Sequence, residues 1–397
     1  MSLTLGPPPR KLWERASRHG ALRRSGNSLQ AYDDSDPSLG TILEALPDPV
    51  VASLEVRDAW RKELADRTVG LEFIVSDLAR WPVGSKVRVA FLDGSPALHA
   101  DIVSALGQIA PEMNLTLDFG HDPATGTYRS WSETDTVHEA EIRVSFDKSG
   151  YWSLVGTDST DTTIAPGGPI GGGPGQRSLN LGGFKSNMPQ GWQGTVRHEF
   201  LHALAFKHEH QNMRGPCEDD FRWDNDPGYI PTTNPNGGFV PDAQGRRPGI
   251  YTYLAGPPNG WNQAKVDHNL RTHEDPTVVA GPFDPASVML YRFAAFFYKT
   301  NPSACAPAGN GVDISNDDKR GLHLLYPDAA SAVNALAEQA INGVEVLEAA
   351  LPRGGEESVD RGLESAPGGG QHTAPGPRSA HLDRLVELLQ AHAASGV

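Results

Sequence analysis

Residues 195–211 read TVRHEFLHALAFKHEHQ, the only stretch of the chain in which several metal-binding side chains recur at spacings that dictate geometry. On a helix, His198 and His202 lie on one face with Cβ atoms about 5–6 Å apart, so that two imidazoles can bind one small cation. Such a pair is typical of a zinc site. Glu199 follows the first histidine and cannot point at the metal in the same way, so it is available to deprotonate a water there.

The third histidine sets a condition on the backbone. In an unbroken helix His208 would lie about 80° from the face of His198. It can join the site only if the chain turns sharply just after His202. The sequence therefore predicts a Zn²⁺ site formed by His198, His202 and His208, with one open position as in catalytic zinc sites. A surface helix with histidines four residues apart by chance is the alternative, and His210 is a candidate competitor of His208 whose spacing matches no metal-site template.

The run HEFLHALAFKHEH at 198–210 resembles the zinc motif of the metzincin metallopeptidases, and HAL-F-HEH resembles their astacin branch. SVMLY at 287–291 is similar to the Met-turn of that family, which would place Met289 beneath the zinc and bring Tyr291 to the site. ISNDD at 314–318 and GLHLLYP at 321–327 resemble its closing helix. The resemblance covers about residues 81–327 and implies a metzincin-like zincin of the α/β (α+β) class. That fold has a mixed twisted sheet, an active-site helix and a zinc cleft between N- and C-terminal subdomains.

Two features depart from the family pattern. The family has Gly at the position of Ala205, in a left-handed conformation that ends the helix, and Ala there costs roughly 1 kcal/mol or somewhat more. The separation of His208 from Met289 is also long, so we expect an insertion around residues 214–282.

The resemblance implies a zinc endopeptidase that acts on protein or peptide substrates, with Glu199 as general base and Tyr291 as a second catalytic residue. One alternative is a catalytically silent metzincin-fold module that binds proteins. Another is hydrolysis of a non-peptide amide at the same site. The presence of Glu199 favours catalysis, because a protein that only binds needs no base beside the metal.

The composition limits the other possibilities. The 397 residues have a net charge of −15, which argues against a nucleic-acid partner, and the chain has no apolar run long enough for a membrane span. The glycines of residues 165–175 lack the Lys and Ser/Thr of a phosphate-binding loop, so we expect a flexible crossing loop.

Family resemblance favours an extracellular location, although the N-terminus has no recognisable signal peptide. Cys217 and Cys305 are either one disulfide or two buried thiols. The oligomeric state is not indicated.

The chain divides by composition into three parts. Residues 1–80 are expected to form a partly disordered N-terminal extension, residues 81–327 the catalytic domain, and residues 328–397 a helical tail. Val56 and Trp60, with Leu64 at the next four-residue step, predict a helix in the extension. The tail is expected to contain two amphipathic helices, around residues 333–344 and 382–389, on either side of a Gly/Pro-rich linker at 352–379.

Alternating apolar residues predict strands in the catalytic domain around residues 86–92, 115–119, 142–146 and 178–181. Leu98, Ile102, Leu106 and Ile109 predict a helix after the first strand. Residues 146–159 occupy the place of the family's edge strand, which could bind an extended peptide through its backbone. The alternative is that Tyr151 and Trp152 are simply core aromatics.

Overall fold

The computed structural model describes residues 45–67, 79–272, 281–293, 295–350 and 377–394. Residues 1–44 and 68–78 of the extension that is expected to be partly disordered lie outside the described residues, as do residues 273–280 of the predicted insertion and most of the predicted linker.

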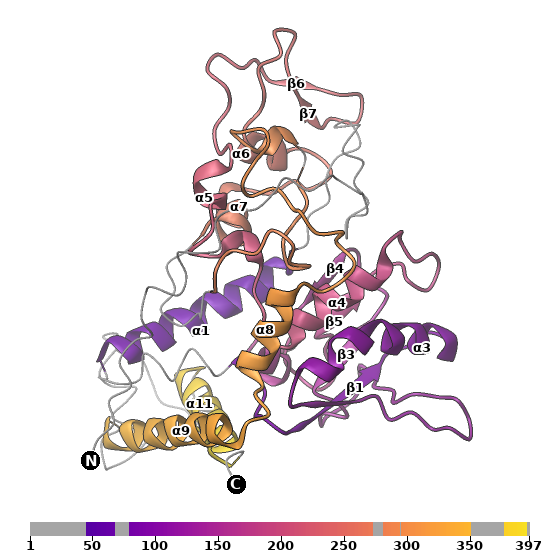
Figure 1. Cartoon of the computed structure of the whole chain (residues 1–397), viewed down its shortest axis with the longest axis vertical. Helices are drawn as coiled ribbons and strands as arrows, with labels where there is room; N and C mark the ends of the chain where they lie inside the picture. The colour runs from indigo at the N-terminus through magenta and orange to yellow at the C-terminus, as the bar shows by residue number, and fades with distance from the viewer. Residues whose placement is uncertain (1–44, 68–78, 273–280, 294, 351–376, 395–397) are drawn as a thin grey trace, which may run out of the picture.

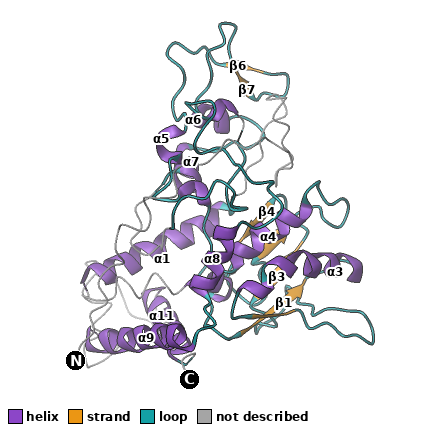
Figure 2. Cartoon of the chain, viewed as in Figure 1, coloured by secondary structure: helices purple, strands orange, loops and turns teal. Residues whose placement is uncertain are grey.

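A five-stranded sheet lies beside α3 and α4, toward the lower right of Figures 1 and 2. Its strands are β1 (Lys86–Phe91), β2 (Thr116–Asp118), β3 (Ile142–Ser145), β4 (Tyr151–Ser153) and β5 (Leu179–Leu181). They lie in the order β2-β1-β3-β5-β4, with β4 antiparallel to β5 and every other pairing parallel. The four strands expected from alternation are confirmed, and β4 is an edge strand. The fold is therefore of the mixed α/β class.

Two helices share one hydrophobic core with the sheet. They are α3 (Pro96–Ala105) and α4 (Trp192–Ala203), which lie in contact. Val87, Val89 and Phe91 alternate along β1 and point into this core, because successive side chains of a strand face opposite ways. Ile102 of α3 and Phe200 of α4 are buried in the same cluster. The sheet thereby supports the helix that contains the first two histidines.

The predicted insertion folds into a second lobe with its own aromatic core, at the top of Figure 1. Its elements are α5 (Cys217–Asp220), β6 (Thr232–Thr233), β7 (Phe239–Val240), α6 (Ile250–Ala255) and α7 (Gln263–Leu270). A disulfide joins Cys217 to Cys305, which decides between the two readings of these cysteines. The bond links the start of the lobe to the segment that follows the Met289 turn. Helix α8 (Asn316–Leu325) then returns to the main core.

The helix predicted in the N-terminal extension is confirmed as α1 (Asp48–Arg67). The apolar spacing describes its buried side only in part, since Val56 is 62% exposed whereas Trp60 packs against residues of the C-terminal tail. Val50 packs beside Trp152, and the buried Arg57 forms ion pairs with Asp158 and Asp161. A buried guanidinium requires such partners, which the apolar pattern alone does not reveal.

The tail contains α9 (Ala330–Ala350) and α11 (Pro377–Ala393), which pack against each other. The ring of His381 in α11 lies 5.6 Å from that of Trp60 in α1, so the terminal helices meet. The predicted linker extended too far, because residues 377–379 already belong to α11. Proline fits the first turn of a helix, where its missing N–H costs nothing.

The glycine-rich residues 165–175 form a loop before β5. Gln176 donates hydrogen bonds to the carbonyls of Ala165 and Gly168, and the buried Arg143 donates to that of Gly171. None of the described helices is both long and apolar enough to cross a bilayer.

Candidate metal centre

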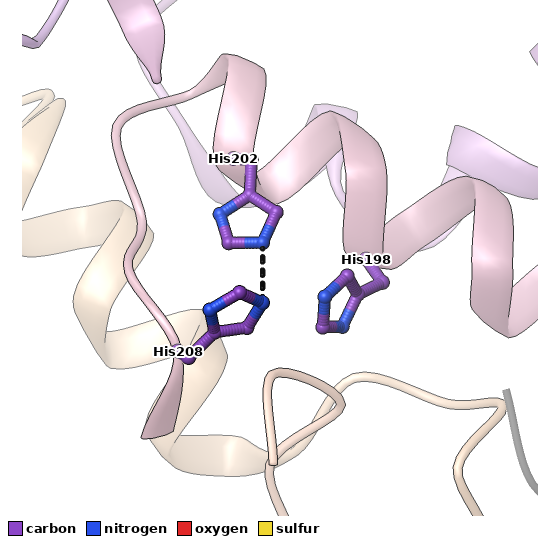
Figure 3. Close-up of side chains that lie close together, drawn as sticks. All are labelled: His198, His202 and His208. Carbon is purple, nitrogen blue, oxygen red and sulfur yellow. Dashed lines mark hydrogen bonds between the residues drawn. The ribbon is translucent and has the colours of Figure 1, made fainter. Parts of the chain in front are cut away.

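Helix α4 places the first two histidines one turn apart on its buried side. The rings of His198 and His202 have centroids 4.9 Å apart, and both side chains are buried. Figure 3 shows both rings turned toward His208, which comes from the chain after the helix. The Nε2 atoms of His202 and His208 are 3.1 Å apart, and one ligand atom from each histidine lies within 4.8 Å of the others.

The predicted turn after His202 is confirmed. Ala205 has φ of +74°, the left-handed conformation expected for this position, although its residue type is not glycine. The Phe206 N–H donates to the carbonyl of Leu201, and the Ala205 N–H donates to that of His202. These bonds are typical of a helix that ends in a left-handed residue. The helix therefore ends early enough for the chain to turn and bring His208 back beside it.

Distant side chains bind the carbonyls at the end of α4. The indole Nε1–H of Trp81 donates to the carbonyl of Ala203 at 2.8 Å, and the hydroxyl of Tyr326 donates to that of Leu204 at 3.1 Å. The last carbonyls of a helix have no partner within it, so these donors stabilise the terminated helix. Sequence reasoning missed both roles, although the chain segment of Tyr326 was part of the predicted closing helix.

Two histidines are oriented through their second ring nitrogen. The Nδ1 of His198 lies 2.8 Å from the carbonyl of Val288, and the Nδ1 of His202 lies 2.8 Å from that of Phe206. Each carbonyl can only accept, so each Nδ1 carries the proton and each Nε2 is left as the metal-binding atom. The turn at Ala205 thus provides an orienting contact for His202 as well as a change of direction.

The segment 287–291 is fixed from below by helix α8. The Asp318 carboxylate accepts hydrogen bonds from the Ser287 hydroxyl at 2.6 Å and the Val288 N–H at 3.1 Å. The Met289 carbonyl accepts from the N–H of Glu209 at 3.0 Å, which fixes the chain directly after His208. Nothing in the linear pattern indicated that Asp318 would support this turn, because the contact spans about thirty residues.

The side chain of Glu209 lies in the same region. Burial raises the pKa of its carboxyl to about 7, while hydrogen bonds from the Asp284 N–H and the Asn212 amide act in the opposite direction. Its backbone and its carboxylate thus both connect the His208 segment to residues 284–289.

The three histidines fit a zinc ion. At the usual Zn–N distance, two nitrogens of a tetrahedral site lie about 3.3 Å apart. The 3.1 Å between the Nε2 atoms of His202 and His208 is already close to this value, and small side-chain rotations would bring in His198. In the described residues, these three are the only group of His, Cys, Asp or Glu side chains placed to bind a metal.

The other predicted site residues lie on the segments that contribute to or contact this group. Glu199 follows His198 in α4 and is 1% exposed. The Tyr291 ring centroid lies 4.3 Å from that of His208, and Met289 is buried in the main core. Tyr151, at the edge of the sheet, is a neighbour that sequence reasoning did not connect to Glu199. Burial raises the pKa of its phenol, and the Glu199 charge raises it further.

His210 does not compete with His208 for the metal. Its Nε2 lies 2.9 Å from the carbonyl of Asn269, within the second lobe. Its ring is buried beside Tyr291.

No protein-family model and no curated protein matches the chain. Among solved structures, it is similar to two of myroilysin and one of high choriolytic enzyme 1, a hatching enzyme zinc-protease from Oryzias latipes (medaka fish). The myroilysin structures are 26% and 22% identical, with TM-scores of 0.42 and 0.38; each match covers 63% of this chain, and 97% and 86% of theirs. The hatching enzyme is 16% identical, with a TM-score of 0.36, over 62% of this chain and 94% of its own.

Replacing Ala205 by Gly should stabilise the protein, because glycine removes the Cβ strain of a left-handed residue. The gain should be about 0.5–1 kcal/mol after allowing for the greater freedom of unfolded glycine. The matched control is Ala100→Gly at an exposed position of helix α3, which should cost about 1 kcal/mol. Melting temperatures of both variants provide the test, and a loss of stability at position 205 would contradict the turn.

Replacing His202 by Ala should remove zinc, because two histidines bind the ion far less tightly than three. Even with zinc added, the variant should melt near the temperature of the metal-free wild-type protein, since no ion connects the helix to the turn. Metal analysis after gel filtration is the measurement. One zinc per chain in the variant would rule out His202 as a ligand.

Proposed function

We propose that this protein is a zinc-dependent endopeptidase of the metzincin type, close to the astacin branch, with residues 81–327 as its catalytic domain. The observation that carries the proposal is the convergence of His198, His202 and His208 beside Glu199. A left-handed turn brings the third histidine back to a helix that already holds the base. Three imidazole ligands with one open position, beside a carboxylate that is not a ligand, are typical of a hydrolytic rather than a structural zinc site.

Zinc held by the three histidines would polarise the scissile carbonyl and make a neighbouring water more acidic. Glu199 would take the proton of the attacking water and deliver it to the leaving amine. Its position next to His198 on helix α4 supports this role. Its burial removes competing solvent, which strengthens its electrostatic interactions with the substrate.

Tyr291 would donate a hydrogen bond to the oxyanion that forms when water attacks the carbonyl. Its ring lies 4.3 Å from that of His208 and 6.0 Å from that of His198, which supports a role for the phenol at the metal site. A neutral donor directed at developing charge in a dry site is worth about 2.7–4 kcal/mol.

The edge strand supports a peptide as substrate. The Leu154 N–H donates to the carbonyl of Ser178, and the Gly150 carbonyl accepts from the Gly182 N–H, so alternate residues of β4 bond to β5. The backbone groups of Tyr151 and Ser153 therefore point away from β5, toward the outer edge of the sheet. An extended peptide could add there as a further strand.

The disulfide supports an extracellular location. Such bonds form and persist in oxidising compartments and are rare in reducing ones.

The zinc-loaded protein should cleave a denatured protein such as casein, and a chelator should abolish the cleavage.

Glu199→Ala should keep zinc while turnover falls by about 100- to 10,000-fold, because only the general base is lost. Mass spectrometry of the fragments measures the cleavage, and metal analysis measures the zinc content. Unchanged turnover in Glu199→Ala would contradict the mechanism in which Glu199 is the general base. Zinc binding without cleavage of any protein would favour the silent binding module, and cleavage of small amides alone would favour a non-peptide amide.

Replacing Tyr291 by Phe keeps the ring and removes the donor. The value of kcat should fall by about a hundred- to a thousandfold, while KM and zinc content change little. If Tyr291 only satisfies a polar group in the core, the variant would instead lose about 1 kcal/mol of stability and keep nearly full turnover. Steady-state kinetics and melting temperature measured on one sample distinguish the two roles.

A further inference from the structure

His210 lies two residues after the third proposed zinc ligand and is turned away from the metal. Its side chain is fully buried. The ring Nε2–H donates to the carbonyl of Asn269 at 2.9 Å, across 59 positions of sequence. The site chemistry described above leaves this buried, oriented imidazole without a role.

The ring of His210 supports two rings of the proposed active site. It stacks on Tyr291 with centroids 4.6 Å apart and planes inclined by 29°, and on His208 at 5.0 Å and 27°. Tyr291 and His208 are themselves 4.3 Å apart, so the three rings are in mutual contact. Behind them Phe293 meets His210 edge-on at 5.8 Å. A shift of the His210 ring would therefore move a ligand and the proposed oxyanion donor together.

Helix α7 of the second lobe holds this ring in place. The last carbonyls of a helix have no N–H donor within the helix, and α7 ends at Leu270. The carbonyl of Asn269 accepts from His210, and that of His268 accepts from the side-chain amide of Gln211 at 3.0 Å. The end of α7 thus binds two consecutive side chains next to His208, and the negative end of the helix dipole favours such donors.

We infer that His210 is a positioning residue: anchored to the end of α7, its ring fixes the rings of His208 and Tyr291. The second lobe would then set the geometry of the metal site from outside it. The part that concerns Tyr291 rests on the proposed peptidase function, whereas the part that concerns His208 is independent of turnover.

Two substitutions separate the ring from its anchor. His210→Gln keeps an N–H donor and removes the ring, while His210→Phe keeps a ring and removes the donor. His99 provides matched controls, because its buried ring has its Nε2 2.9 Å from the carbonyl of Asp93 and stacks on Phe91 at 3.9 Å. His99→Gln and His99→Phe make the same chemical changes in the core beside α3.

The first measurement is zinc affinity, by competition with a chelator, in the full-length variants. His210→Gln should weaken zinc binding about tenfold or more, as for other residues that orient a ligand, whereas His99→Gln should change it less than about threefold. Zinc binding by His210→Gln within that threefold range, or no weaker than in His99→Gln, would overturn the inference. If His210→Gln does not fold, His210→Phe is judged against His99→Phe by the same criterion.

The second measurement is turnover of one peptide. His210→Phe should lower kcat by about tenfold, with KM within about threefold, because it disturbs the oxyanion donor rather than substrate binding. With zinc at saturation, adding His210→Phe to Tyr291→Phe should lower kcat by clearly less than the tenfold loss in the wild-type background, since part of the effect of His210 passes through Tyr291. A full tenfold further loss in the double variant would overturn this part. A wild-type protein that turns over no peptide would refute the proposed function, while zinc affinity would still decide whether His210 supports His208.

Discussion

The site depends on a single backbone conformation, the left-handed turn at Ala205. With a helical residue there, α4 would continue and His208 would lie on the wrong face of the helix. With φ of +74° the chain reverses, and the Nε2 atoms of His202 and His208 come within 3.1 Å. An alanine holds this conformation at a cost of roughly 1 kcal/mol or more. The neighbouring structure must therefore favour the turn.

Several contacts from distant parts of the chain favour it. Trp81 precedes the sheet and Tyr326 follows α8, yet both donate hydrogen bonds to carbonyls at the end of α4. Phe206 packs so closely against Gly321 that a Cβ there would lie 2.8 Å from its ring. Leaving buried carbonyls without donors would cost about 1–3 kcal/mol each, which is comparable to the strain at Ala205. The closing helix is thus part of the metal site, although it contributes no ligand.

The two lobes contribute to the site in different ways. The sheet and α4 fix the positions of His198, His202 and Glu199 through a continuous core. The second lobe acts through hydrogen bonds and ring contacts, from the end of α7 to His210 and on to His208 and Tyr291. The disulfide between Cys217 and Cys305 connects the start of that lobe to the segment after the Met289 turn. The long segment between His208 and the Met289 turn is therefore in contact with the site rather than separate from it.

The sequence by itself determined the parts that depend on local spacing. Two histidines four residues apart indicate one helical face, alternating apolar residues indicate the strands, and the position of His208 requires a turn after His202. The tertiary structure alone decided which of the remaining polar groups meet. The pairing of Cys217 with Cys305, the buried ion pair of Arg57 with Asp158, the support of Val288 by Asp318, and the direction in which His210 points all join positions far apart in sequence. Spacing along one chain segment carries no information about such contacts, because each is set by how the helices and strands pack together.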